Sequence, residues 1–320
     1  MAGGQERILR RRIRSVQSTK KITRAMELIA ASRIVKAQQR VLAARPYAEQ
    51  ITHVISNLAA AGAGTGQALL EDRPDVRTVG YVVITADRGL CGGYNANVLR
   101  AAERDLKAEV EAGRGYALFC VGRKAEGYFR YRGYELTHVT SGISDQPSYE
   151  DARGVAAAVV AAFEAAEVDL VKIVSTKFIS AGSQAVAQQQ YLPLERVEAE
   201  VGAASADYEF EPSPGAILTS LLPRYAESKL YAAMLDAAAS EHAARQRAMK
   251  AATDNADELI RNLTRVMNRA RQDAITTEIM EIVSGAEALR QAATGSNDLL
   301  LDRIERDDYF IQRDQEHQHA

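Results

Sequence analysis

A glycine-rich loop at Ala86–Asn95 contains the residue types that come nearest to nucleotide or catalytic chemistry. It reads ADRGLCGGYN and lies between a β-branched stretch and a helical stretch, which is where phosphate-binding loops occur. Its glycines, Gly89, Gly92 and Gly93, fit neither the dinucleotide-binding pattern nor the Walker A pattern, and no lysine follows to meet a phosphate. We therefore interpret the loop as a tight turn and not as a phosphate site.

Cys91 in this loop precedes a predicted helix, and a helix N-terminus lowers the pKa of a nearby thiol in principle. Three of the five histidines, His53, His138 and His242, show no spacing that would supply a base to this thiol. The second cysteine, Cys120, lies in a different predicted element and forms no metal-ligand pair with Cys91. The sequence therefore predicts no catalytic residue, no metal site and no cofactor.

Strands and helices alternate over residues 76–195, on both sides of this loop. The apolar and β-branched runs predict strands at Thr78–Thr85, Tyr116–Val121, Tyr134–Thr140, Leu170–Ser180 and Ala185–Leu194. Helical periodicity predicts helices at Asn95–Ala112, Arg123–Tyr131 and Tyr149–Ala166. This alternation is typical of a central Rossmann-like α/β domain with a partly parallel sheet.

A long helix is predicted on each side of this domain, over 1–61 and over 216–293. In the first, no glycine or proline interrupts Arg7–Ala44, and Pro46 is expected to kink or restart the helix. In the second, Arg224–Ala293 contains a single glycine, Gly285. Helices of this length cannot be covered by a small globule, so we expect them to pair as an antiparallel coiled coil.

The apolar stripe of the second helix changes character along its length. It repeats at heptad spacing through Ala252, Ala256, Leu259, Leu263, Val266 and Ala270, and resumes after a five-residue step at Ile275, Ile279, Ile282, Ala286 and Leu289. Alanines let a partner helix approach closely, whereas the bulkier final stretch is expected to face something else. Residues 294–320 form an acidic tail that we expect to be disordered.

Charge is distributed unevenly along a chain whose net charge is only −2. Residues 1–45 carry twelve Lys and Arg against two Glu, and residues 293–320 carry seven Asp and Glu against three Arg. A basic helix in a coiled coil is typical of DNA-binding zippers. Here the cations are spread over 45 positions and the chain has no tryptophan, so nucleic acid is not an expected partner. No stretch is long and apolar enough to insert directly into a bilayer.

Three segments resemble the gamma subunit of F-type ATP synthases of the bacterial type. Ile13–Gln38 (IRSVQSTKKITRAMELIAASRIVKAQ) is similar to the N-terminal helix of that family, and Ile84–Asn95 (ITADRGLCGGYN) is similar to its central loop. Met249–Leu289, which contains RQDAITTEIMEIVSGAEAL, resembles its C-terminal helix and is the most specific of the three. The resemblance implies a non-catalytic rotor subunit of the central stalk, which couples proton flow through the membrane sector to ATP synthesis at the beta-subunit sites.

The resemblance also implies partners, a location and contact residues. The partners are the alpha and beta subunits of the catalytic head, the epsilon subunit and the c-ring, and the location is peripheral, at the cytoplasmic face of the bacterial plasma membrane. The implied contact residues are Lys20, Lys21, Arg24, Met26, Arg33, Lys36, Arg88, Cys91, Arg271, Gln272, Thr276 and Glu278. The alternative is an α/β enzyme with a coiled-coil oligomerisation arm, which would need a convergent set of catalytic groups.

Overall fold

The computed structural model describes residues 2–60, 66–195, 211 and 213–316, with side chains for 4–58, 66–195, 211 and 213–293. The chain divides into two units. The smaller unit combines Met1–Lys20 with Asn255–Ala320, and the larger unit is Lys21–Asp254. Two long helices, α1 (Ala2–Ala60) and α5 (Pro214–Glu316), pass through both units.

The larger unit is built on a five-stranded sheet with the strand order β3-β2-β1-β4-β5. Its strands are β1 (Thr78–Ile84), β2 (Gly115–Val121), β3 (His138–Thr140), β4 (Leu170–Phe178) and β5 (Gln184–Leu192). Its remaining helices are α2 (Tyr94–Glu111), α3 (Arg123–Tyr131), α4 (Tyr149–Glu164) and the 3-10 turn η1 (Ala68–Leu70). Strands β1 to β4 are parallel and β5 is antiparallel to β4, which confirms the predicted Rossmann-like α/β fold.

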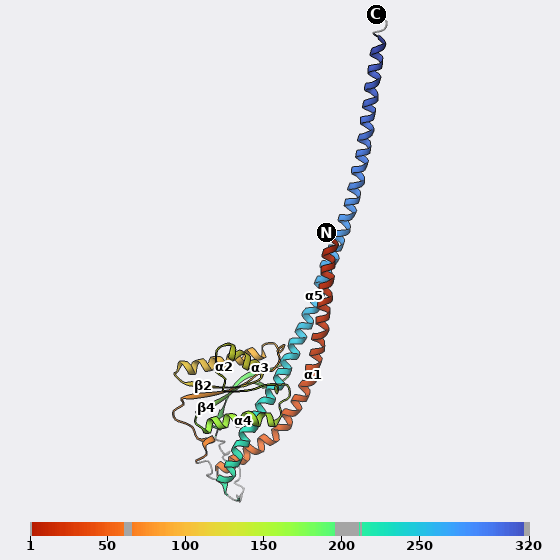
Figure 1. Cartoon of the computed structure of the whole chain (residues 1–320). Coiled ribbons are helices and arrows are strands. Elements are labelled where there is room, and N and C mark those ends of the chain that lie inside the picture. The colour runs from red at the N-terminus through yellow and green to blue at the C-terminus, as the bar shows by residue number, and fades with distance from the viewer. Residues whose placement is uncertain (1, 61–65, 196–210, 212, 317–320) are drawn as a thin grey trace. The chain divides into compact units, whose positions relative to one another are not determined.

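Helices cover both faces of this sheet, as Figure 1 shows for α2 and α3 on one face and α4 on the other. The alternation along β1 explains the two layers. Val79, Tyr81 and Val83 pack against α2 and α3, whereas Val82 and Ile84 face α4 and the long helices. Because successive side chains of a strand point to opposite faces, one buried strand supplies both cores.

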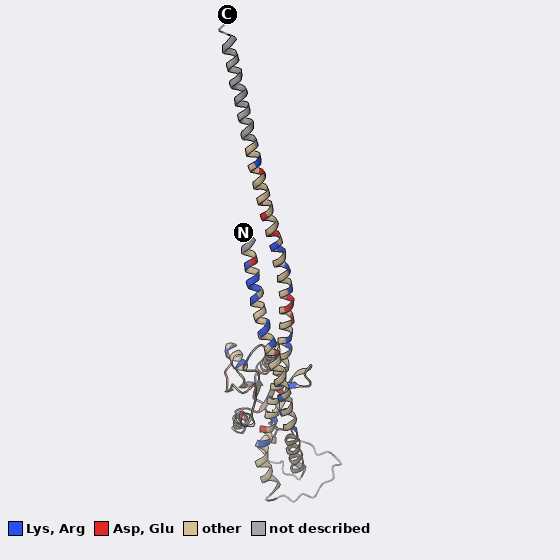
Figure 2. Cartoon of the chain, turned by 90° about the vertical axis from the view of Figure 1, so that its right-hand side faces the viewer, with Lys and Arg blue, Asp and Glu red and all other residues tan. Residues whose placement is uncertain are grey.

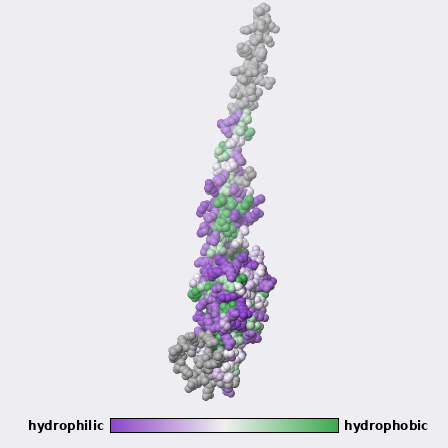
Figure 3. Space-filling model, turned by 90° about the vertical axis from the view of Figure 1, so that its left-hand side faces the viewer, coloured by the Kyte–Doolittle hydropathy of each residue, from purple (hydrophilic) through white to green (hydrophobic). Residues whose placement is uncertain are grey.

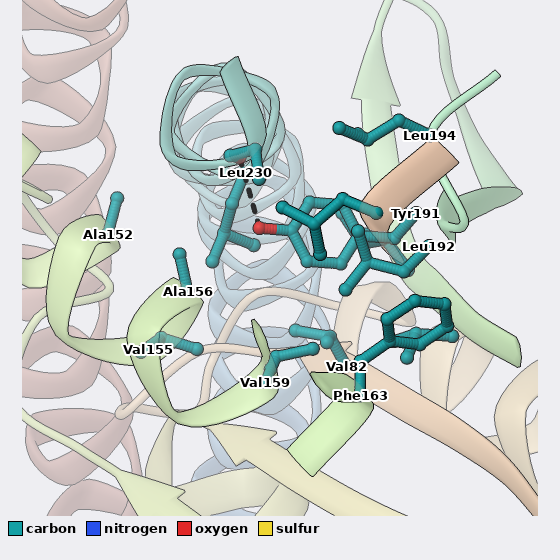
Figure 4. Packing of buried hydrophobic residues seen from close by; sticks show 14 of the residues in the cluster. Val82, Ala152, Val155, Ala156, Val159, Phe163, Tyr191, Leu192, Leu194 and Leu230 are labelled. Atoms are coloured by element: carbon teal, nitrogen blue, oxygen red, sulfur yellow. Dashed lines mark hydrogen bonds between the residues drawn. The ribbon is translucent and has the colours of Figure 1, made fainter. Parts of the chain in front are cut away.

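The core on the α4 face also anchors α5 to the sheet (Figure 4). Val159 and Phe163 of α4, Tyr191 of β5 and Leu230 of α5 belong to one buried cluster. The Tyr191 hydroxyl donates a hydrogen bond of 3.0 Å to the backbone carbonyl of Ala226 in α5. This part of α5 is therefore an integral element of the α/β domain.

The long helices run antiparallel within the larger unit, as predicted. The hydroxyls of Thr23 and Thr253 lie 2.8 Å apart, while Tyr47, further along α1, shares a cavity with Tyr231, which comes earlier in α5. In the smaller unit α1 and α5 also contact each other, through an ion pair between Lys20 and Asp257.

The structure refines the predictions about the long helices in three places. Of the two expected effects of Pro46, a kink or a restart, the structure shows no restart, because α1 continues to Ala60; Leu42 is exposed, so the carbonyl that a proline leaves unpaired can bind water. Helix α5 begins at Pro214, close to the predicted start at residue 216, because proline suits a first helical turn and the Ser213 hydroxyl accepts a hydrogen bond from Ala216 N. The tail was expected to be disordered, but α5 continues through it to Glu316, and no proline follows Pro223 to end the helix.

The third predicted strand is also shorter than expected, at His138–Thr140. The backbone N–H of Tyr134 bonds to the carbonyl of Phe129 at the end of α3, and its ring packs edge-on against Phe129. These contacts hold the start of the predicted strand in the turn after α3, so that only its last residues pair with β2.

Candidate functional site

The C-terminal part of α5 presents an uncovered apolar face. Every described side chain from residue 275 to residue 293 is exposed. Ile275, Ile279 and Ile282 are 48%, 54% and 67% exposed, and Leu289 is 74% exposed. Figure 3 shows hydrophobic residues gathered on one face of the helical segments. Contiguous exposed apolar residues at helical spacing mark a surface that another molecule covers.

Four predicted contact residues surround the beginning of this face. Arg271, Gln272, Thr276 and Glu278 are all exposed. Among the residues that the structure describes, none of the four has a hydrogen bond or an ion pair with another side chain. Their polar groups are therefore available to an outside partner, beside an apolar surface that also lacks one.

The predicted basic residues of α1 fall into two groups, and Figure 2 shows how the cations follow one another along this helix. Lys21 and Lys36 are exposed. Lys20 forms the ion pair with Asp257, and Arg24 donates to both carboxylate oxygens of Glu27 at 2.9 Å. A charge already paired within the chain has less to gain from a second partner, so Lys21 and Lys36 are the stronger candidates.

Arg33 and Met26 have more internal contacts than the sequence suggested. Arg33 forms an ion pair with Asp145, in the loop before α4, and is half-buried. Met26 is also half-buried.

Exposed apolar residues of α1 that the sequence reasoning missed lie at intervals of seven: Leu28, Val35 and Leu42 are 57%, 54% and 58% exposed. That spacing was the signal that could have identified this outer face of α1.

The glycine-rich loop places its three candidate side chains differently. Arg88 is exposed, and so is its neighbour Leu90, which adopts a left-handed backbone conformation with φ +63°. Cys91 is 1% exposed, and the Asn95 amide donates to its sulfur at 3.1 Å. Burial raises the pKa of the Cys91 thiol. The expectation that Cys91 faces a partner is therefore corrected: its side chain is enclosed by its own loop, and Leu90 occupies the surface instead.

Asp87 fixes the shape of this loop. Its carboxylate accepts hydrogen bonds from the backbone N–H groups of Gly142, Ser144 and Arg123, at 2.9–3.0 Å. Burial would raise the pKa of Asp87, but these hydrogen bonds outweigh it and the pKa lies below its ordinary value. The ionised carboxylate thus joins the loops that follow β1, β2 and β3.

Helix α5 is attached along the edge of the sheet where open α/β domains bind nucleotides, outside the carboxyl ends of the parallel strands, and a cavity of about 370 Å³ remains there between Gly92, Thr176 and Ala248. Ser240 donates to the Thr176 carbonyl at the end of β4, and Arg245 donates to the Gly89 carbonyl in the glycine-rich loop. Arg245 also donates to Glu241 at 2.6 Å, and burial raises the pKa of Glu241 although Arg245 opposes it. The sequence reasoning missed this pair, whose four-residue spacing within an alanine-rich stretch was its only signal.

The residues that the structure describes include no helix that is long and apolar enough to cross a bilayer. The exposed side chains described above define three candidate contact surfaces: the apolar end of α5 with its polar surroundings, the outer face of α1 and the exposed tip of the glycine-rich loop.

Comparisons with known proteins agree with this reading. A family model described as ATP synthase matches residues 5–289. The ATP synthase gamma chain of Parafrankia sp. (strain EAN1pec) is 53% identical over 297 residues, which cover 91% of this chain and 99% of the relative. That of Mycobacterium tuberculosis is 47% identical over 301 residues, which cover 89% of this chain and 98% of the relative.

A solved structure of the Euglena gracilis mitochondrial ATP synthase contains a chain of similar fold. The TM-score is 0.64 at 19% sequence identity, and the match covers 90% of this chain and 95% of that chain. The coverage of both chains leaves no large part of the fold unmatched. Together with the family model and the bacterial relatives, this shows that the chain belongs to the family of ATP synthase gamma chains.

Proposed function

We propose that this chain is the central rotor shaft of a bacterial F-type ATP synthase and that it performs no catalysis itself. Its long helices stand inside a ring of alternating alpha and beta subunits, and its α/β domain meets the epsilon subunit and the c-ring. Proton flow through the membrane sector turns the shaft. The observation that carries this proposal is the uncovered apolar face of α5 from Ile275 to Leu289.

The chemistry of that face suits a rotating contact. Burial of an apolar side chain is worth about 1.5–3 kcal/mol and has no directional preference. A ring of subunits can therefore hold Ile279, Ile282 and Leu289 at any angle of rotation. Hydrogen bonds and ion pairs are directional, so Arg271, Gln272, Thr276 and Glu278 would contact the ring differently at each angle.

Rotation can drive the beta subunits only if the shaft binds one of their conformations better than another. We assign this discrimination to the four polar residues of α5 and to the outer face of α1. There, Lys21 and Lys36, together with Arg88 of the loop, would meet acidic segments of the beta subunits. Lys20, Arg24, Met26 and Arg33 border the same surface, and Cys91 acts only by supporting the loop.

The proposed location is the cytoplasmic face of the plasma membrane, where the c-ring holds the chain peripherally. The alternative of an α/β enzyme has less support because of how α5 packs. Ser240 and Arg245 attach α5 to the Thr176 carbonyl of β4 and to the Gly89 carbonyl of the glycine-rich loop, so α5 narrows the crevice at the carboxyl end of β1 and β4 where a nucleotide or a substrate would enter.

Reconstitution with the alpha, beta and epsilon subunits and the membrane sector in vesicles tests the proposal. The measured quantity is proton pumping per ATP hydrolysed. Arg271→Ala should lower this ratio, whereas Arg104→Ala, which changes an exposed arginine of α2, is the matched control and should leave it unchanged. Equal ratios for the two variants would contradict the assigned contact.

The pure chain should show no ATP turnover. Turnover that exceeds that of a Gly92→Ala, Gly93→Ala double variant would show that the glycine-rich loop has a catalytic role, and the non-catalytic assignment would then be wrong.

A further inference from the structure

A cavity of about 610 Å³ lies between α1, α4 and α5, entirely within the larger unit. Its volume lies within the range of about 300–1,000 Å³ that small-molecule sites occupy. The proposed rotor function does not use this cavity. Three tyrosines, one from each helix, line it: Tyr47, Tyr149 and Tyr231.

The aromatic wall of the cavity is fixed by internal contacts. The rings of Tyr149 and Tyr231 meet edge to face, with centroids 5.6 Å apart. The Tyr149 hydroxyl donates to a carboxylate oxygen of Glu227 at 2.7 Å. Burial, and then this carboxylate, raise the pKa of Tyr149, so its hydroxyl remains a neutral donor. A wall held in this way does not need to be ordered when a ligand binds.

Two polar groups in the cavity remain available. Ser228 is only 5% exposed and lines the cavity, yet its hydroxyl has no hydrogen-bond partner among the described residues. Arg224 also lines the cavity, is exposed, and has no ion pair within the described part of the chain. The two residues are four positions apart on α5, so their side chains lie on the same face and can reach one group.

We infer that this cavity binds a small aromatic molecule with a single anionic group. The anion accepts hydrogen bonds from the Arg224 guanidinium and the Ser228 hydroxyl, and the ring packs against the tyrosines. Ala44 and Ala48, the small side chains that line the cavity from α1, leave space for the ring. The Ser228 hydroxyl and the Arg224 guanidinium both present donors to the cavity, which favours a polar ligand over a purely apolar one.

The bound molecule contacts three helices, so it stabilises the larger unit by an amount that grows with the logarithm of its concentration over its dissociation constant. It would thereby restrain α1 against α5 within the larger unit. This inference does not depend on the rotor function, because binding is measured on the chain alone.

Calorimetric titration of the full chain tests it, with naphthalene-1-sulfonate as the probe. We expect one site, no measurable binding of inorganic sulfate, and affinity at least about tenfold lower for the uncharged naphthalene-1-sulfonamide. Arg224→Gln should weaken sulfonate binding about tenfold, as should Ala48→Leu, which fills the space from α1. Arg104→Gln on α2 is the control and should bind as the native chain does.

Circular dichroism confirms that each variant is folded, and both altered positions are at least partly exposed, which favours folding. If Arg224→Gln and Ala48→Leu bind the probe as tightly as the control, the probe lies elsewhere, for example on the apolar end of α5, and the inference is wrong.

A second measurement distinguishes a small ligand from a protein segment. In an Ala48→Cys variant the new thiol is accessible, whereas Cys91 and Cys120 are both buried. Maleimide labelling in the assembled complex should remain fast and should be slowed by naphthalene-1-sulfonate. If assembly itself abolishes labelling, a neighbouring subunit fills the cavity, and the small-ligand site is overturned.

Discussion

Two stretches of α5 have apolar faces of similar composition and opposite surroundings. In the larger unit, Leu218, Leu222 and Leu230 are at most 1% exposed, covered by the sheet, α4 and α1. In the smaller unit, Ile275, Ile282 and Leu289 are 48–74% exposed. An apolar stripe therefore indicates that one side of a helix is buried against other residues, but it does not indicate whether those residues belong to the same chain or to another one.

The helical structure of the two stretches is therefore stabilised by different interactions. The first is stabilised by the folding of the α/β domain. The second has no partner within the described chain, and an isolated helix of this length in water is only marginally stable. Substitutions should therefore separate the stability of the chain from the stability of the complex.

The largest expected effect comes from one truncation in each stretch. Leu230→Ala should destabilise the isolated chain by about 2–5 kcal/mol, because it leaves a cavity in a filled core. Ile279→Ala should change that free energy by less than about 0.5 kcal/mol. Urea unfolding of the isolated chains measures both, and similar losses for the two variants would mean that the end of α5 is covered within its own chain.

Backbone geometry sharpens the contrast at Gly122, in the turn after β2. Its φ is +96°, and a Cβ there would lie 2.2 Å from the Thr85 carbonyl oxygen. Gly122→Ala should cost about 1–3 kcal/mol, because the strained conformation cannot relax in a packed domain. Gly285→Ala in the exposed part of α5, where a Cβ meets nothing within 4 Å, should instead stabilise the helix by about 1 kcal/mol. Thermal unfolding measures the change in melting temperature of each variant. Changes of the same sign for the two variants would contradict this prediction.

Acid titration probes a buried charge of the larger unit. Burial would raise the pKa of Glu103, but hydrogen bonds from Tyr128 and Arg132 hold it at about 2, below its ordinary value of 4.5. The lowered pKa stabilises the fold above pH 4.5, and this stabilisation is lost as the pH falls from 4.5 to 2. Glu103→Gln should therefore lower stability at pH 7 and flatten its dependence on pH in that window. A variant with the native pH dependence would show that this carboxylate does not contribute.

The smallest effect is expected for the ion pair in the smaller unit. Lys20 and Asp257 are both partly exposed, so Lys20→Ala should cost at most about 1 kcal/mol, and less at high salt. Chemical unfolding at low and high ionic strength measures this. A loss of several kcal/mol that does not depend on salt would place this pair in a buried interface.

The sequence predicted the elements of the α/β domain closely because their periodicities are strong. The strand and the helix on either side of the glycine-rich loop, for example, lie within one or two residues of the prediction. The sequence failed where a particular side-chain contact decides the outcome. Tyr134 belongs to a turn because of Phe129, and Cys91 is enclosed because Asn95 and α5 surround it.

The candidate surfaces were predictable only in part, for a related reason. The stripe from Ile275 to Leu289 is visible as a pattern, but the pattern does not show whether these side chains are exposed or covered within the chain. The cavity that contains Ser228 and Arg224 is lined by residues of three helices, and no spacing within any one of these segments predicts it.

Hydrogen exchange along α5 tests the central claim most directly. Amide exchange is measured by mass spectrometry on peptides spanning residues 275–289, first in the isolated chain and then in the complex with alpha and beta subunits. The account predicts rapid exchange in the isolated chain and strong protection after assembly, with little change in β1 and α4 of the buried domain. Exchange at 275–289 that is equally fast before and after assembly would contradict it, because the apolar end of α5 would then not be the surface that the catalytic head covers.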